Sequence, residues 1–162
     1  SPTPTPTPTV TTTPTVTPTP TPFAIVPEGT MISANQHGDT DIFIVNGLGY
    51  KRLFLNPIIF SFYGHLGGYQ NVVNVRPDVR DTYGTSGLFR NCETNAAQIW
   101  AVEVTGEDGG IFHRVAFSGN QAIRQDPKFF DKVFCINSSE EAWYPKSTQD
   151  YTNLNQIPIY QR

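Results

Sequence analysis

The sequence predicts an α+β, β-rich domain that follows an extended arm and contains two copies of one structural unit. Three observations carry this prediction. Residues 1–22 are almost entirely proline and threonine, a β-hairpin pattern occurs twice after them, and each hairpin is followed by a short helix pattern and a short apolar run. We expect one compact domain over residues 23–162, with units at about 29–86 and 87–146.

The arm at residues 1–22 contains eleven Thr, eight Pro, two Val and one Ser. Proline at alternate positions fixes φ and removes amide donors, which excludes a helix or a central strand and leaves an extended polyproline-II-like stalk. Such stalks are semi-rigid spacers, and closely spaced threonines also accept O-linked sugars, so a glycosylated and an unmodified arm both stay open. The candidate O-glycosylation sites are Thr3, Thr5, Thr7, Thr9, Thr15, Thr17, Thr19 and Thr21.

Two strand–turn–strand patterns predict the hairpins. In the first, an alternating run at 41–45 is followed by the turn residues 46–49 and a second run at 50–54. In the second, runs at 98–104 and 111–117 flank a longer loop that contains three glycines. We therefore expect each unit to begin with an antiparallel pair of strands.

A helix pattern follows each hairpin. Asn56 and Pro57 predict a capped helix start, and the helix is expected to continue through Leu66 until two glycines end it. Ser118 takes the place of Asn56 in the second unit, ahead of a helix pattern at 120–125.

An apolar run and an acidic, helix-turn-like segment complete each unit. The runs are VVNV at 72–75 and VFCI at 133–136. Val72 and Val133 are 61 positions apart, as are Tyr83 and Tyr144, and this shared offset indicates a repeat. In the hairpins the offset is 62, from Arg52 to Arg114. This offset aligns His113 with Lys51, so we expect His113 at an exposed position on a polar strand face. One hairpin and one helix bury too little apolar area alone, so we expect the two copies to pack together, with an edge strand at 154–160.

The two hairpins, DIFIVNGLGYKRLFLNPIIFSFYGHLG and QIWAVEVTGEDGGIFHRV, resemble the tandem units of large secreted surface proteins of ultra-small, candidate-phyla bacteria. Those units typically read VYYV…GKRYVF and KVYAVE…GGVLRWV, and the resemblance covers roughly Gly29 to Lys146. It implies an S-layer-like, adhesive or fibre-forming component that lacks known catalytic residues and is often joined to Thr-Pro linkers. The turn at 46–49 and the paired cysteines depart from the usual pattern and leave the ligand open.

Charge and hydropathy exclude two classes of partner. The net charge is -3, and the basic residues are interspersed with carboxylates, so the chain lacks the basic footprint of a nucleic-acid-binding protein. No run approaches the roughly 18 apolar residues of a membrane span, so we expect no membrane insertion.

The sequence shows no catalytic, metal-binding or cofactor-binding constellation. His37, His65 and His113 lie in separate segments without helical spacing. Asp39 and Asp41 lack the further oxygens of a calcium loop. We therefore expect a protein that is not an enzyme and that needs no cofactor.

Cysteines and aromatic residues give the remaining candidates. Cys92 and Cys135 both lie in the second unit, where either a disulfide or two buried thiols would fit, and a disulfide would stabilise the fold by roughly 3–4 kcal/mol. Trp143, Tyr144 and Tyr69 are candidates for a contact surface, although core packing is equally consistent for the Trp143–Tyr144 pair.

These features together predict a secreted structural or interaction protein of the cell surface, a subunit of a surface layer or filament. Its expected partners are copies of itself, other surface proteins or glycans, and the arm serves as a spacer or an inter-subunit contact. The alternative is a carbohydrate-binding module on a Pro-Thr linker.

Overall fold

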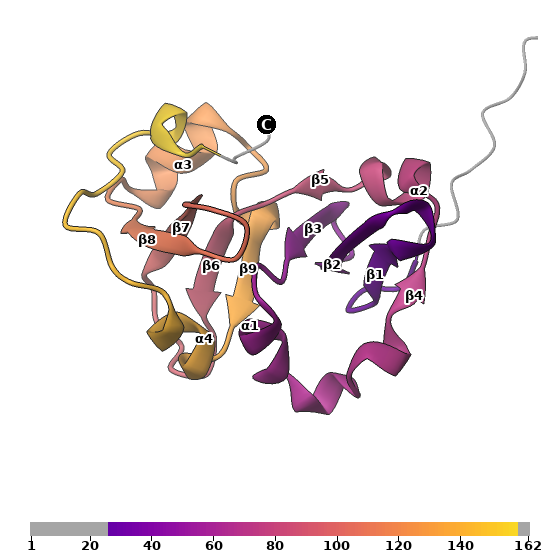
Figure 1. Cartoon of the computed structure of the whole chain (residues 1–162). Helices are drawn as coiled ribbons and strands as arrows, with labels where there is room; N and C mark the ends of the chain where they lie inside the picture. The colour runs from indigo at the N-terminus through magenta and orange to yellow at the C-terminus, as the bar shows by residue number, and fades with distance from the viewer. Residues whose placement is uncertain (1–25, 159–162) are drawn as a thin grey trace, which may run out of the picture.

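The computed structural model describes residues 26–158, which form a mixed α+β, β-rich fold with two sheets in one compact domain (Figure 1). The fold class predicted from the sequence is confirmed. The Pro-Thr stalk at 1–22 and its eight candidate O-glycosylation sites lie outside the described residues. None of the described helices is long and apolar enough to span a bilayer.

The first sheet has the strand order β4-β1-β2-β3-β5. Its strands are β1 (Met31–Ala34), β2 (Asp39–Val45), β3 (Tyr50–Leu53), β4 (Val73–Asn74) and β5 (Gly84–Thr85). β2 and β3 form the predicted hairpin. Its turn is fixed by Asn46, whose Oδ1 accepts hydrogen bonds from the Leu48 and Tyr50 amides at 3.0 Å, and Gly49 supplies the positive φ of 89° that the turn needs.

The second sheet has the strand order β8-β7-β6-β9. Its strands are β6 (Leu88–Asn91), β7 (Ile99–Val104), β8 (Gly110–Arg114) and β9 (Val133–Ile136). β7 and β8 form the second predicted hairpin, and β9 is the predicted apolar run at 133–136.

The two sheets share one pattern of connections. In each, a central strand (β1 or β6) pairs antiparallel with the hairpin and parallel with the strand that follows the helix (β4 or β9). The sequence patterns did not predict either central strand. Duplication itself stays a prediction; in the two hairpins, Arg52 lies opposite Ile44 and His113 lies opposite Ala101.

Short capped helices connect the strands. α1 (Pro57–Ser61) begins as predicted, with the Asn56 side chain accepting from the Ile58 amide at 2.8 Å, but it ends earlier than predicted. A single 3-10 turn, η2 (Gly64–Leu66), replaces its expected continuation, and a second one, η3 (Tyr69–Asn71), follows the two glycines. The other elements are α2 (Pro77–Thr82), α3 (Gly119–Gln125), α4 (Ser138–Trp143), η1 (Asn35–His37) and η4 (Phe130–Lys132).

The largest core cluster lies between the two halves of the molecule. It joins Phe54, Ile59 and Phe60, from around α1, to residues of the second sheet such as Phe89 and Phe112. Figure 1 shows α1 beside β9, at the junction of the two halves. The two sheets therefore share this core cluster, as the packing argument from the sequence requires.

The C-terminal segment differs from the prediction. Leu154–Gln156 form a 3-10 helix, η5, with a capping box between Asn153 and Gln156, and not part of a strand at 154–160. Residues 159 and 160 of that range lie outside the described residues. Leu154 and Ile157 pack into a second core cluster with Tyr151, so the segment covers the outer face of the second sheet.

Candidate functional site

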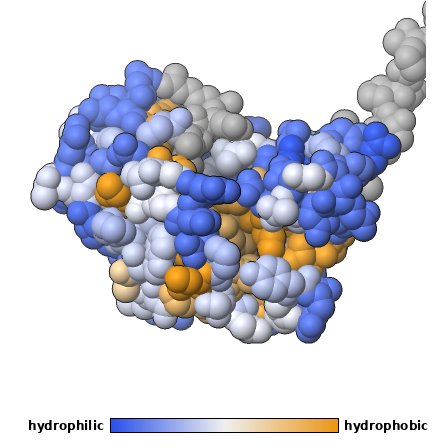
Figure 2. All heavy atoms as spheres, in the orientation of Figure 1, coloured by the Kyte–Doolittle hydropathy of each residue, from blue (hydrophilic) through white to orange (hydrophobic). Residues whose placement is uncertain are grey.

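A cleft of about 630 Å³ lies between the two sheets. Its walls come from the end of β2, the segment after α1, β9 and the loop before β9. Figure 2 shows apolar residues gathered between the two halves on the face turned toward the viewer. Since small-molecule and peptide sites are usually concave, the cleft is the first place to examine for function.

Arg52 lies at the base of the cleft and is paired with Glu140. Arg52 comes from β3 and Glu140 from α4, and the Arg52 Nη1 to Glu140 Oε1 distance is 2.8 Å. The Tyr63 hydroxyl donates to the other carboxylate oxygen of Glu140. The Arg52 and Glu140 side chains are 2% and 0% exposed, so this ion pair is formed away from water. It joins the first sheet to the second unit.

Aromatic rings surround the Arg52 guanidinium. Its central carbon lies 4.2 Å from the Phe54 ring centroid and 5.1 Å from that of Tyr63. Such cation–π contacts strengthen when the charge is desolvated. The Arg52 Nε has no hydrogen-bond partner within the described residues, and the rings and Glu140 lie against the buried charge.

Burial shifts the pKa values of the acidic groups around this ion pair. It raises the pKa of Glu140 above its usual range, and the Arg52 charge together with the Tyr63 and Arg52 hydrogen bonds only partly opposes this shift. Burial likewise raises the pKa of Tyr63 and of Tyr144 well above the ordinary value of 10.0. Both tyrosines therefore stay neutral over the physiological pH range.

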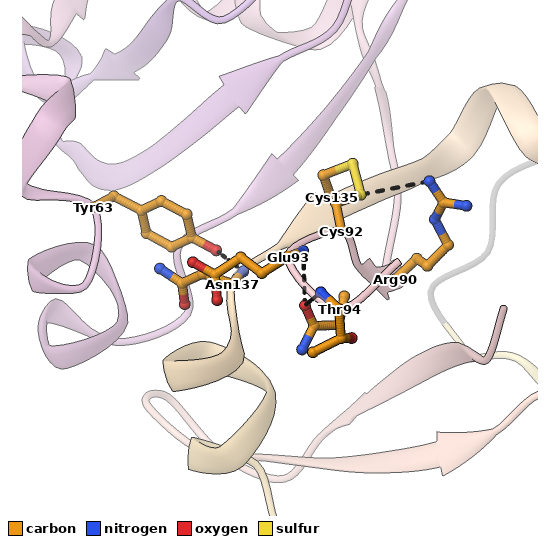
Figure 3. Close-up of a disulfide and its surroundings, with 8 residues drawn as sticks. Tyr63, Arg90, Cys92, Glu93, Thr94, Cys135 and Asn137 are labelled. Atoms are coloured by element: carbon orange, nitrogen blue, oxygen red, sulfur yellow. Dashed lines mark hydrogen bonds between the residues drawn. A yellow bond between two sulfur atoms is a disulfide. The ribbon is translucent and has the colours of Figure 1, made fainter. Parts of the chain in front are cut away.

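A disulfide between Cys92 and Cys135 forms part of the cleft wall. The sequence left open whether these cysteines form a disulfide or two buried thiols, and the structure has the disulfide. It links the end of β6 to β9 with a Cα–Cα distance of 5.4 Å. Arg90 Nη2 lies 3.6 Å from the Cys92 sulfur (Figure 3). The Glu93 carboxylate accepts from the Ser138 amide at 2.8 Å. The wall is thus anchored to α4.

β9 presents a free edge to the cleft. Residues 133–137, which include the whole of β9, line the cavity, and β9 is the last strand in the order of its sheet. The Ile136 carbonyl accepts from the Cys92 amide, so Phe134 and Ile136 direct their backbone groups to β6. Backbone groups alternate along a strand, so those of Val133 and Cys135 point to the other side.

The two ends of this edge are already occupied. The Val133 amide donates to the Phe130 carbonyl, and the Asn137 amide donates to the Tyr63 hydroxyl at 3.2 Å, which Figure 3 shows pointing toward Asn137. Cys135 lies between them, and no strand of the described fold pairs with it on that side. A short stretch of extended chain could therefore pair with β9 at Cys135.

Two large apolar side chains stand among the residues that line the cleft. Leu48 is 60% exposed and Phe130 is 49% exposed. The cleft is bridged near them by Asn46, whose Nδ2 donates to the Asp131 carbonyl at 2.8 Å. An apolar partner would bury both exposed side chains, and the Asn46 bridge sets the distance between the two walls.

The three aromatic residues expected at a contact surface have different surroundings. Tyr144 is 2% exposed and belongs to the main core cluster, so its expected surface role is wrong. Trp143 is half-buried against the same cluster, with its ring edge-on to Tyr144. Tyr69 is exposed, as expected, and lies outside the cleft.

His113 is also buried rather than exposed. Its ring nitrogens lie 2.8 Å from the Gln149 carbonyl and 2.7 Å from Glu103 Oε2, and its ring stacks on Tyr151. It therefore helps to hold the C-terminal segment against β8. No group of three or more His, Cys, Asp or Glu side chains in residues 26–158 is arranged to hold a metal ion.

Sequence reasoning found the cysteines of the cleft but not Arg52, Tyr63 or Glu140. In sequence, Glu140 belongs to an acidic pair that looks solvated, and nothing local indicates that it meets Arg52, which is 88 positions away. No family model, no curated protein and no solved structure matches this chain. The geometry of the cleft is therefore the basis for the functional argument.

Proposed function

We propose that this chain is an extracellular structural protein, a subunit of a surface layer or filament, and that the cleft is its assembly site. In this proposal an extended segment of a neighbouring copy enters the cleft and pairs with the free edge of β9. The observation that carries it is the position of Cys135, whose backbone faces the cleft from an edge strand.

The Cys92–Cys135 disulfide supports an extracellular location, because disulfides form and persist in oxidising compartments. It also ties the edge strand β9 to the end of β6, so the edge is held in place before any partner arrives. Preorganisation of this kind reduces the entropy cost of binding. The resemblance to secreted surface proteins is in agreement with this proposal.

The segment best suited to enter the cleft is Phe23-Ala24-Ile25, because Val26 already belongs to the described fold, where its amide donates to the Tyr83 hydroxyl at 3.0 Å. It is the apolar run that follows the Pro-Thr arm. Prolines cannot donate to a β-ladder, so pairing would begin at Phe23, and the arm would act as the spacer between neighbouring copies. Large apolar residues at alternate positions, Phe23 and Ile25, would fall on one side of the added strand.

The test is assembly of the full chain at increasing protein concentration, followed by sedimentation velocity and negative-stain electron microscopy. The wild-type chain should form larger species and filaments. Ile25→Asp in the segment and Leu48→Glu at the cleft should each leave a monomer, because each places a charge in an apolar contact. Ile123→Glu is the matched control, since Ile123 is also exposed but lies on α3, and it should assemble normally.

A synthetic peptide of residues 19–28 gives a second readout. It should bind the wild-type chain, inhibit its assembly and fail to bind the Leu48→Glu variant. A chain that remains monomeric at all concentrations, or that assembles equally well with Ile25→Asp, would contradict the proposal.

A further inference from the structure

A second cavity, separate from the cleft, is lined by hydrogen-bonding groups and one exposed aromatic ring. It has a volume of about 270 Å³ and lies on the first sheet, where η1, β2, η3 and β4 meet. Its polar residues are Ser33, Asn35, Thr40 and Asn74, and its aromatic residue is Tyr69. We call it the Tyr69 subsite.

The Tyr69 ring is a fixed platform rather than a loose side chain. Two successive glycines with positive φ, Gly67 at 83° and Gly68 at 78°, turn the chain into η3. Asn71 Nδ2 then donates to the Leu66 carbonyl at 2.9 Å, which closes the turn. The Tyr69 ring packs on Phe60 at a centroid distance of 4.6 Å, yet 62% of the residue stays exposed.

The amides beside the ring are also held in place. Asn74 Nδ2 donates to Asn35 Oδ1, so the two side chains orient one another. Within residues 26–158 this leaves Asn35 Nδ2 as an unused donor and Asn74 Oδ1 as an unused acceptor. The subsite thus offers a donor and an acceptor close to one exposed ring.

The lining selects for a neutral ligand with hydroxyl groups. No Asp, Glu, Lys, Arg or His lines the cavity, and its other residues, Ile42 and Val72, are apolar. An anion or cation would find no opposite charge there, whereas a sugar ring offers C–H groups for the tyrosine face and hydroxyls for the amides. The volume is slightly below the roughly 300–1,000 Å³ of typical ligand pockets, which favours a single sugar ring over a long chain.

We propose that the Tyr69 subsite binds one neutral sugar residue of a glycan. Tyr69 stacks on the ring face, while Asn35 and Asn74 bond its hydroxyls. The proposal does not depend on assembly through the cleft, because the two cavities share no lining residue. It assigns to the chain a glycan-binding activity that a structural subunit does not require.

The experiment is a titration of the full chain, followed by two-dimensional NMR. The probes are glucose, galactose, mannose and N-acetylglucosamine, with glucuronic acid as the charged comparison. At least one neutral sugar should shift the Asn35 and Asn74 side-chain amides saturably. Tyr69→Ala should weaken that binding roughly tenfold, and Tyr69→Phe should retain it, because the ring supplies the contact.

Asn35→Ala should also weaken binding, whereas Ile123→Ala, which removes an exposed apolar side chain from α3, should not. The proposal is overturned if none of the neutral sugars produces saturable shifts at these amides, or if Tyr69→Ala binds as well as the wild type. Assembly of the Tyr69→Ala variant, measured by sedimentation, should be unchanged, so failure here is distinguishable from failure of the assembly proposal.

Discussion

Arg52 and Glu140 form an ion pair across the junction of the two sheets, with 2.8 Å between Nη1 and Oε1 and with both side chains out of contact with solvent. Such a pair is a weak source of net stability, because desolvation offsets much of the attraction. Its loss is nonetheless costly, since the remaining charge would have no partner. The pair therefore fixes how the two halves meet more than it adds to the stability of the fold.

Glu140→Ala should lower the free energy of unfolding by about 3–5 kcal/mol, because it leaves the Arg52 guanidinium buried without its carboxylate. Urea unfolding measures the change. The control is Asp150→Ala, which removes the ion-pair partner of the exposed Arg114 and should have a much smaller effect. Equal effects of the two substitutions would show that Glu140 is not buried as described.

Replacing both members of the ion pair should be far less damaging than removing one. The double variant Arg52→Met/Glu140→Leu should be within about 2 kcal/mol of the wild type, because neither charge then needs compensation. A double-mutant cycle built on urea unfolding gives the coupling energy. If the double variant loses as much as the sum of its single changes, Arg52 and Glu140 do not act as a pair.

The Cys92–Cys135 disulfide should contribute roughly 4 kcal/mol, as expected for a crosslink between residues 43 positions apart. The Cys92→Ser/Cys135→Ser double variant and the reduced wild-type chain should show the same loss in chemical unfolding. If the double variant is as stable as the oxidised wild type, the two cysteines are not linked in the native protein.

Trp143 and Tyr144 are adjacent at the end of α4, but their truncation to alanine should lower the free energy of unfolding by different amounts. Tyr144→Ala should cost about 3–5 kcal/mol, because Tyr144 is fully enclosed and packs on Phe112 at a centroid distance of 4.0 Å. Trp143→Ala should cost clearly less, although tryptophan is larger, because Trp143 is only half-buried. A larger loss at Trp143 than at Tyr144 would reverse the assignment of core and surface.

Tyr63 should make the fold sensitive to alkaline pH. Its folded-state pKa is raised above the ordinary value of 10.0, so the stability it contributes is complete below about pH 10 and is lost as pH rises further. The free energy of unfolding should therefore decline more steeply above about pH 10 in the wild type than in Tyr63→Phe. Parallel pH profiles for the two proteins would exclude this role for the Tyr63 hydroxyl.

Local patterns predicted the parts of this fold that depend on local chemistry. The β2–β3 and β7–β8 hairpins, and the caps Asn56 and Ser118, follow from turn and capping residues that lie within a few positions of each other. The central strands were missed because β1 and β6 are four residues long, lack alternation and are defined by partners far along the chain.

The site was harder to predict because its residues look solvated in sequence. Arg52 and Glu140 are charged, and only the packing of α4 against the first sheet encloses them. Tyr144 follows an acidic turn, yet it is buried because its ring lies against Phe89 and Phe112. The cysteines could be found because Cys92 lies just before the second predicted hairpin and Cys135 lies in the predicted apolar run that becomes β9.

The most direct test of assembly through β9 is amide hydrogen exchange at Cys135, measured in the dilute monomer and in the assembled protein. The Cys135 amide faces the cleft, whereas the Phe134 and Ile136 amides are already directed to β6. Assembly should slow exchange at Cys135 by roughly tenfold or more and leave Phe134 and Ile136 nearly unchanged. Unaltered exchange at Cys135 in the assembled protein would contradict the proposal that a neighbouring chain pairs with this strand.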